Sequence, residues 1–204
     1  MELKYLLLAV FFIAQSRAQD VPSITCTYVL SAPNYICYYN IINPNGEDNF
    51  TSIGGEHAEG MTNADVTTFL PGTVLNTTNI PQIFCSQFPN VNMAVFSFLN
   101  VRTLANNPFS GCTNLTWLSL WANPVGEIPE GTFANNRLLE YLDLDSTNLT
   151  TLPVNVFQSQ SNLRTLDIRS NPFAALPGGV FRPVSNLVTL YLTYCNISSI
   201  NRMW

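Results

Sequence analysis

The sequence predicts an α/β solenoid-like repeat fold with a short parallel β-sheet on one face and few helices. One observation is a strict recurrence of leucine every 24 residues, at Leu115, Leu139, Leu163 and Leu187. A second is that proline and phenylalanine recur with the same period. No single helix or strand has so long a period, so each unit is a supersecondary element that must stack on its neighbours to bury its apolar side chains.

Each repeat has the same internal order when its first leucine is counted as position 1. Position 4 is filled by Leu118, Leu142, Leu166 and Leu190, position 15 by Pro129, Pro153 and Pro177, and position 19 by Phe133, Phe157 and Phe181. Positions 3 to 8 alternate between apolar and polar residues, which predicts a short strand, and the proline and phenylalanine then turn the chain around the opposite side. We expect repeats that begin at residues 91, 115, 139, 163 and 187, preceded by a degenerate first repeat over residues 67–90.

Residues 91–204 resemble extracellular leucine-rich repeat (LRR) proteins with the Toll-like, "typical" 24-residue unit LxxLxLxxNxLxxLPxxxFxxLxx. The resemblance implies a right-handed horseshoe whose parallel sheet lines the concave face. It also implies a buried asparagine ladder at position 9, and here the chain departs from the pattern. The position is occupied by Leu99, Asn123, Thr147, Asn171 and Cys195. Asn-Pro therefore alternates with Thr-Asn and Cys-Asn, and we expect the regularity to loosen towards Cys195 because its thiol donates weakly.

The N-terminus has the features of a secretory signal peptide. Residues 5–14 form an unbroken apolar run after a short head that carries Lys4, and Ser16-Arg17-Ala18 is a small-x-small end. The run is too short to span a membrane, so we expect residues 1–18 to be removed after Ala18 and the protein to be secreted and extracellular.

Residues 19–66 are predicted to form a β-rich, disulfide-containing N-terminal cap. The segments around Cys26 and Cys37 are rich in β-formers, and Asn45-Gly46 is typical of a hairpin turn. The favoured disulfide joins Cys26 to Cys37, since an oxidising compartment makes disulfides the default for these cysteines. The stretch also resembles the cap and first coil of insect-type secreted LRR proteins.

The remaining cysteines are predicted to include one bridge between coils. Cys85 and Cys112 are 27 residues apart, about one repeat, which places them on neighbouring coils and favours a second disulfide. Cys195 is left over. It is either a small buried residue in the ladder position or the partner of an intermolecular disulfide or of a cysteine further downstream. The last repeat is incomplete at Trp204 and has no cap, which predicts a truncated product or an end that docks onto a partner, as in a homo- or hetero-oligomer.

The charge composition excludes several classes of function. Only 10% of residues are charged and the net charge is −5, so the chain has no basic surface for nucleic acid and no polybasic membrane patch. N-linked glycans would supply the hydration that the charges do not. The sequons lie at Asn49, Asn76, Asn114, Asn148 and Asn196.

Catalysis, a metal site and a cofactor are not expected. The single histidine, His57, lies between two glutamates in a glycine-rich stretch and is interpreted as part of a solvated loop. No nucleophile motif accompanies it, and residues 43–48 lack the spacing of a calcium-binding EF-hand loop. Carboxylate pairs among Asp143, Asp145 and Asp167 would need a deep, dry pocket that a solenoid does not offer. We therefore expect a protein that is not an enzyme.

The repeat register predicts which side chains project from the concave sheet and could bind a protein. Exposed tryptophan, tyrosine and arginine are the residue types that dominate protein interfaces. The selected residues are Trp117, Trp121, Tyr141, Asp143, Asp145, Asp167, Arg169 and Tyr191. An alternative is that this sheet exposes a miscellaneous set of side chains and that Asp145 and Arg169 simply pair across coils.

The expected function is that of a secreted, glycosylated LRR protein that grips a protein ligand or co-receptor on its concave face. The resemblance suggests recognition in innate immunity. The alternative is an LRR protein of the extracellular matrix, of cell adhesion or of a receptor ectodomain, with a mainly structural role.

Overall fold

The computed structural model describes residues 23–43, 50–75, 77–104 and 107–197. The predicted signal peptide, the Asn45-Gly46 turn, the sequons at Asn49 and Asn76 and the end of the last repeat lie outside these residues.

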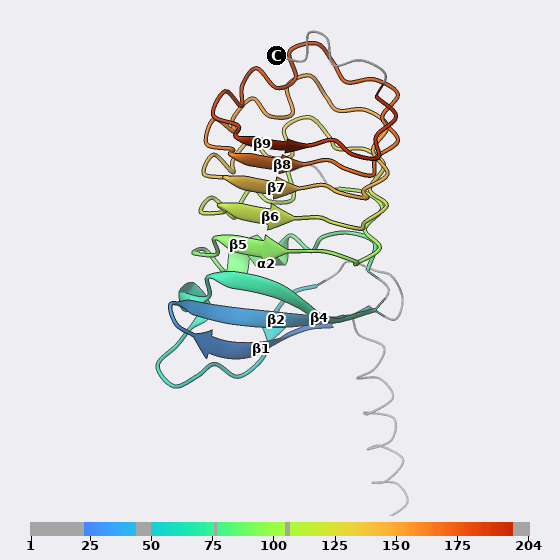
Figure 1. The fold of residues 1–204 in the computed structure, drawn as a ribbon. Coiled ribbons are helices and arrows are strands. Elements are labelled where there is room, and N and C mark those ends of the chain that lie inside the picture. The colour runs from blue at the N-terminus through green and yellow to red at the C-terminus, as the bar shows by residue number, and fades with distance from the viewer. Residues whose placement is uncertain (1–22, 44–49, 76, 105–106, 198–204) are drawn as a thin grey trace, which may run out of the picture.

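A nine-stranded sheet runs through the whole described chain in the order β3-β1-β2-β4-β5-β6-β7-β8-β9. The strands are β1 (Ser23–Ser31), β2 (Asn34–Ile42), β3 (Ile53–Gly54), β4 (Thr68–Leu75), β5 (Met93–Val95), β6 (Trp117–Ser119), β7 (Tyr141–Asp143), β8 (Thr165–Asp167) and β9 (Thr189–Tyr191). The only helical elements among the described residues are a 3₁₀ turn, η1 (Asn63–Asp65), and one short helix, α2 (Ile83–Gln87). Figure 1 shows the strands stacked one above another from the cap to the C-terminal coil.

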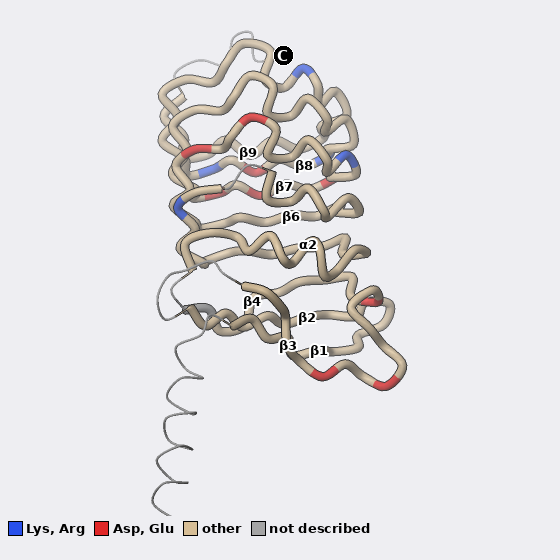
Figure 2. The backbone as a smooth tube through the Cα atoms, turned by 180° about the vertical axis from the view of Figure 1, so that it is seen from behind, with Lys and Arg blue, Asp and Glu red and all other residues tan. Residues whose placement is uncertain are grey.

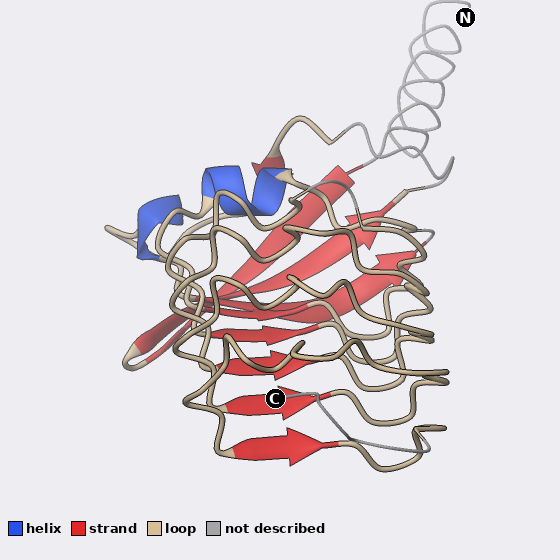
Figure 3. Ribbon diagram, turned by 90° about the horizontal axis from the view of Figure 1, so that it is seen from above, coloured by secondary structure: helices blue, strands red, loops and turns tan. Residues whose placement is uncertain are grey.

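The array is parallel and in the predicted register. Met93 pairs with Trp117, Trp117 with Tyr141, Tyr141 with Thr165, and Thr165 with Thr189. Each step is one repeat of 24 residues. Seen along the stack, the strands form one side of each coil and irregular loops close the other side (Figure 3). The predicted solenoid with a short parallel sheet and few helices is therefore confirmed.

The cap continues the sheet. β1 and β2 are antiparallel, and Cys26 and Cys37 lie on these two strands and form the predicted disulfide. The expected hairpin after β2 was wrong: the next strand, β3, pairs with β1 in parallel instead of returning along β2. β2 is already paired on its other edge with β4, so the chain passes on to the free edge of β1.

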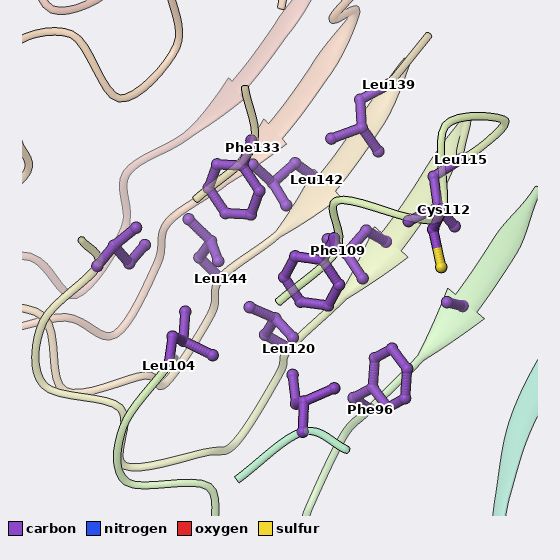
Figure 4. Packing of buried hydrophobic residues seen from close by; sticks show 14 of the residues in the cluster. Phe96, Leu104, Phe109, Cys112, Leu115, Leu120, Phe133, Leu139, Leu142 and Leu144 are labelled. Atoms are coloured by element: carbon purple, nitrogen blue, oxygen red, sulfur yellow. The ribbon is translucent and has the colours of Figure 1, made fainter. Parts of the chain in front are cut away.

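Leucine and phenylalanine fill the space between the sheet and the loops. Phe109 and Phe133 stack with ring centroids 6.1 Å apart, and both are fully buried. Figure 4 shows Phe96, Phe109 and Phe133 in a row, with Leu120 and Leu144 beside them. Phe157 and Phe181 stack in the same way at 6.3 Å, and burial of such a side chain is worth ~1.5–3 kcal/mol. The second predicted disulfide, Cys85–Cys112, ties the first coil to the short helix α2.

The ladder asparagines bind the coil that precedes them. The Oδ1 atom of Asn171 accepts hydrogen bonds from the backbone N–H groups of Thr147 (3.1 Å) and Leu149 (2.9 Å). Its Nδ2 group donates to the carbonyls of Leu144 (2.8 Å) and Ile168 (3.1 Å). Thr147 donates its hydroxyl to the carbonyl of Leu144 in its own coil at 2.6 Å.

The Asn-Pro coils close their loops locally, which explains the alternation in the sequence. The N–H of Val125 donates to the carbonyl of Asn123 at 2.7 Å, across Pro124. This is a three-residue turn, and its central residue needs a φ close to the value that proline fixes. The same turn forms between Phe173 and Asn171 at 2.8 Å. A coil therefore closes its turn with proline when the next repeat has threonine or cysteine at position 9. When the next repeat has asparagine at position 9, the side-chain amide of that asparagine closes the turn instead.

Position 8 of every coil adopts a left-handed backbone conformation although it is never glycine. The residues are Phe98, Ala122, Ser146, Ser170 and Tyr194, with φ between 52° and 60°. Such a conformation is uncommon outside glycine and persists where surrounding contacts hold it. Here the backbone N–H of position 8 donates to a carbonyl of the next coil, as from Ala122 to Asp145 at 3.0 Å.

Candidate functional site: the concave face

We use "concave face" for the surface formed by the outward-pointing side chains of strands β5–β9 and by the residues at positions 7 and 8 of each repeat, which come shortly after each strand. All eight residues selected from the sequence lie on or directly after β6, β7, β8 and β9. Strand pairing sets Asp143 opposite Ser119 on one side and opposite Asp167 on the other. Tyr191 follows Asp167 in the same row. The structure therefore brings the selected residues together on one surface.

Aromatic side chains form two pairs on this face. The rings of Trp117 and Tyr141 are stacked, with centroids 4.7 Å apart and planes 10° from parallel. Phe98 meets Trp121 edge to face at 4.5 Å, and these side chains are 65% and 41% exposed. Aromatic pairs in these geometries are rigid and present a large apolar area. Phe98, at position 8 of the repeat that begins at residue 91, was not among the selected residues.

Arg169 pairs mainly within its own coil. Its Nε donates to Oδ1 of Asp167 at 3.0 Å and its Nη2 to Oδ2 at 2.6 Å, while Oδ2 of Asp145 is 3.8 Å from Nη2. The guanidinium also lies 5.0 Å from the centroid of the Tyr191 ring. The cross-coil pair of Asp145 and Arg169 thus exists but is the weaker contact, and the hydrogen bonds to Asp167 raise the pKa of Arg169.

Asp167 does not project into solvent as the register suggested. It is only 2% exposed, since Arg169 folds back over it. It also accepts a hydrogen bond from the backbone N–H of Arg169 at 3.1 Å. The expectation that the Asp167 side chain is exposed was therefore wrong, and its carboxylate instead fixes Arg169 in place.

Asp143 lies at the centre of the concave face. Its Oδ2 accepts a hydrogen bond from the Ser119 hydroxyl at 2.8 Å, and its Oδ1 accepts one from the N–H of Asp145 at 3.0 Å. Burial raises the pKa of Asp143, with smaller contributions from the charges of Asp167 and Asp145, although the two hydrogen bonds oppose the increase. Ser119, which the sequence analysis did not select, is buried and also contacts the Ser97 hydroxyl at 3.1 Å.

The concave face holds more negative than positive charge. Asp143, Asp145 and Asp167 face the single guanidinium of Arg169, and within the described chain the ion pairs shorter than 4.0 Å are the two that Arg169 makes. Figure 2 shows that charged residues are sparse along the backbone and that several lie in the coils around β7 and β8.

His57 is part of the fold of the cap and was wrongly interpreted as solvated. Its ring stacks on Tyr28 at 3.9 Å, its Nδ1 lies 3.1 Å from the Tyr35 hydroxyl, and its Nε2 lies 2.8 Å from Oδ1 of Asn63. Both ring nitrogens are thus within hydrogen-bond distance of cap side chains, and the Tyr35 hydroxyl also accepts a hydrogen bond from the backbone N–H of Ala58 at 2.9 Å. These contacts hold the loop after β3 against β1 and β2.

The other candidate positions are placed as follows. Of the sequons, Asn114, Asn148 and Asn196 are exposed. Cys195 is half-buried in the ladder position and its Sγ lies 3.2 Å from the carbonyl of Ile168. Burial raises the pKa of its thiol. These contacts are those of a residue that substitutes for the ladder asparagine.

The described residues contain no group of three or more His, Cys, Asp or Glu side chains arranged to hold a metal ion. A cavity of about 410 Å³ lies between the loops and α2, and none of its lining residues carries a titratable side chain. In the part of the chain that the structure describes, no helix is long and apolar enough to cross a membrane.

A repeated coil, a parallel sheet and a ladder position define an LRR fold, and the comparisons with known proteins agree. Residues 113–173 match the family model described as leucine rich repeat. The fold of the chain is therefore the leucine-rich repeat fold, and the family model matches its central repeats. No curated protein matches it in sequence.

Two solved structures are similar to the chain in fold. The APL1 leucine-rich repeat domain superposes with a TM-score of 0.71 at 18% identity, over 88% of this chain and 44% of that one. A chain of the LRIM1/APL1C complex superposes with a TM-score of 0.69 at 17% identity, over 89% of this chain and 32% of that one. The chain therefore spans less than half the length of either structure.

Proposed function

We propose that this LRR protein binds a protein partner through its concave face. The observation that carries the proposal is the stacked pair of Trp117 and Tyr141 directly beside the carboxylates of Asp143 and Asp145. Rigid aromatic groups next to charged groups are the combination that contributes most binding energy at protein interfaces. One of the similar structures is itself an LRR complex, that of LRIM1 with APL1C.

The concave face also has the rigidity that recognition needs. Strands β5 to β8 are held on both sides by their neighbours and β9 on one side, and the ladder asparagines Asn123 and Asn171 fix the turn of the coil that precedes each of them. Binding groups on such elements lose little conformational entropy when a partner docks. The site is therefore organised before the partner arrives.

We further propose that the protein is secreted and glycosylated and acts in innate immune recognition. Two disulfides in a chain of this size are typical of an oxidising, extracellular compartment. The exposed sequons at Asn114, Asn148 and Asn196 leave the concave strands clear, since they lie before or after β6, β7 and β9. The immune role follows from the resemblance to insect-type secreted LRR proteins.

Affinity capture tests the proposal. The secreted protein and the double variant Trp117→Ala/Asp145→Asn are used as bait in extracellular fluid, and bound proteins are identified by mass spectrometry. A convex variant of equal size, Val154→Ala/Glu127→Gln, serves as the control because both residues are exposed and lie away from the strands. We expect the partner to be lost from the double variant alone. Unchanged capture by the double variant would remove the concave face from consideration, and retention in an insoluble matrix fraction would favour a structural role.

A further inference from the structure

Arg169, the cation of the concave face, does not form an ion pair with Asp143 at the centre of that face. Arg169 donates to both oxygens of the Asp167 carboxylate, and the remaining contact to Asp145 is 3.8 Å long. Among the described residues, Asp143 therefore has no cation within 4.0 Å, and Asp145 shares the guanidinium of Arg169 with Asp167. The two residues are linked by one hydrogen bond, which the backbone N–H of Asp145 donates to the carboxylate of Asp143.

Covering this surface with a partner would remove water from these carboxylates. An ionised group that loses its water must gain a hydrogen-bonding partner of opposite charge, or the association is penalised. Asp143 accepts two hydrogen bonds, from Ser119 and from the backbone of Asp145, and neither donor carries a net charge. A protein that docks here with apolar groups alone would leave the Asp143 carboxylate buried without a cation and Asp145 with only its 3.8 Å contact to Arg169.

The surroundings favour an organic cation over a metal ion. Among the described residues, Asp143, Asp145 and Asp167 do not form a group that could hold a metal. The neighbouring groups are instead a stacked Trp117–Tyr141 pair and the Tyr191 ring, which already accepts the guanidinium of Arg169 at 5.0 Å. A basic side chain can pair with a carboxylate and lay its apolar stem or its plane on such rings at the same time.

We infer that the protein partner inserts a basic side chain, arginine or lysine, against Asp143 and Asp145, with apolar neighbours packed on the Trp117–Tyr141 pair. This inference rests on the proposed function, because it takes the concave face as the binding site. It adds the chemistry of the partner: a local positive charge beside apolar residues, complementary to the net negative charge of the face.

The test uses a phage-displayed library of random peptides of about twelve residues, a length that covers the strands of three coils. The library is selected on the intact secreted protein and counterselected on Asp143→Asn/Asp145→Asn. The control Glu140→Gln/Glu127→Gln removes two exposed carboxylates that make no contact with the Asp143 cluster. We expect the enriched peptides to share a basic residue flanked by apolar ones. We also expect them to bind the Asp143/Asp145 variant ~30-fold or more weakly than the control variant.

A synthetic copy of the best peptide then has its basic residue replaced by citrulline or by norleucine, which are close in shape to arginine and lysine but uncharged. We expect this change to weaken binding ~30-fold or more, and the difference to shrink in high salt. Enriched peptides without a basic residue, or equal affinity of the neutral copy, would overturn the inference. Peptides that need Trp117 but tolerate Asp143→Asn/Asp145→Asn would overturn it and leave the proposed function intact. Peptides indifferent to both would count against the proposed function as well. Circular dichroism confirms that each variant is folded.

Discussion

Arg169 and Asp167, two residues apart at the end of β8, form an ion pair through two donor groups, with N–O distances of 3.0 and 2.6 Å. The pair buries the Asp167 carboxylate under the guanidinium and leaves the guanidinium itself accessible at the surface. Arg169 is therefore held in one orientation between Asp167, Asp145 and the Tyr191 ring. This arrangement determines which charges of the concave face remain for a partner.

Arg169→Met should lower the melting temperature more than Arg164→Met, although both residues belong to the same coil. Without the guanidinium, the buried Asp167 carboxylate loses its charged partner, which is a costly state. Arg164 is exposed and makes no ion pair shorter than 4.0 Å among the described residues. Thermal unfolding followed by circular dichroism measures both variants.

The double variant Arg169→Met/Asp167→Asn provides the control for this prediction. It removes the buried charge together with its partner, so it should recover much of the loss in melting temperature. If Arg169→Met and Arg164→Met melt at the same temperature, the ion pair contributes nothing to the fold.

Asn171→Ala should be among the most destabilising polar substitutions in the array. It leaves the N–H groups of Thr147 and Leu149 without partners inside the protein and removes one of the two donors to the carbonyl of Leu144. Each buried group left unpaired costs ~1–3 kcal/mol, so we expect a loss of roughly 3 kcal/mol or more in the free energy of unfolding. Urea denaturation gives this quantity directly.

Thr147→Val is the matched comparison for Asn171→Ala. It removes a hydroxyl that donates to the Leu144 carbonyl and to Oδ1 of Asn171, both of which have another donor. The expected loss is about 1 kcal/mol. Equal losses from the two substitutions would mean that the asparagine does not bind the preceding coil in solution.

Asp143→Asn should leave the fold at least as stable at pH 7 as the native protein. Burial, assisted by Asp167 and Asp145, raises the pKa of Asp143 in the folded state above the value it has in the unfolded chain. The folded state then holds its proton more tightly, so ionisation of Asp143 disfavours folding. This penalty is complete above the raised pKa and disappears below the ordinary carboxyl pKa of about 4.

Melting temperatures of both proteins between pH 7 and pH 4 check this sign. The native protein should gain stability relative to Asp143→Asn as the pH falls through the raised pKa of Asp143. A difference that stays constant over the whole range, or that changes in the opposite direction, would contradict the assignment of a raised pKa.

Cys85→Ser/Cys112→Ser should destabilise the first coils against the rest of the array. The bridge closes a loop with a sequence separation of 27 residues, and the chain-entropy model gives about 3–4 kcal/mol for such a loop. Hydrogen exchange should become faster in α2 and β5 before it changes in β8. A uniform change along the chain would show that the array unfolds as one unit.

Much of the architecture was predictable from the sequence because the 24-residue period specifies it directly. Leu118, Leu142 and Leu166 fall in one register, and the structure pairs them strand to strand. Both disulfides also followed from cysteine positions. The period and the register determine which side chains point outward from the sheet. The residues selected from the sequence therefore lie on one face.

The remaining features depend on side-chain contacts that a periodic pattern does not contain. Asp167 has the register of an exposed residue, but the bidentate pair with Arg169 buries it. Phe98 adopts a left-handed φ of 58° without being glycine, because its N–H reaches the carbonyl of Trp121 in the next coil. His57 is surrounded by exposed residues in sequence, and only the fold brings Tyr28 and Tyr35 onto it.

A buried pair of amides on the side opposite the sheet also escaped the sequence analysis. Asn136 donates to the carbonyls of Phe109 and Cys112, and Gln160, one repeat later, donates to that of Phe133. These amides tie the phenylalanine turns of successive coils together. In the repeats before and after them, the equivalent position is occupied by Cys112 and Val184, so no single residue type marks it in the sequence.

Site-specific photo-crosslinking tests binding through the concave face most directly. A photoreactive phenylalanine analogue is placed either at Thr165 on β8 or at Val154, which is exposed in the loop between β7 and β8. Both proteins are irradiated in extracellular fluid. Binding through the concave face predicts a crosslinked partner from position 165 and none from position 154. A partner crosslinked from position 154 and not from position 165 would contradict it.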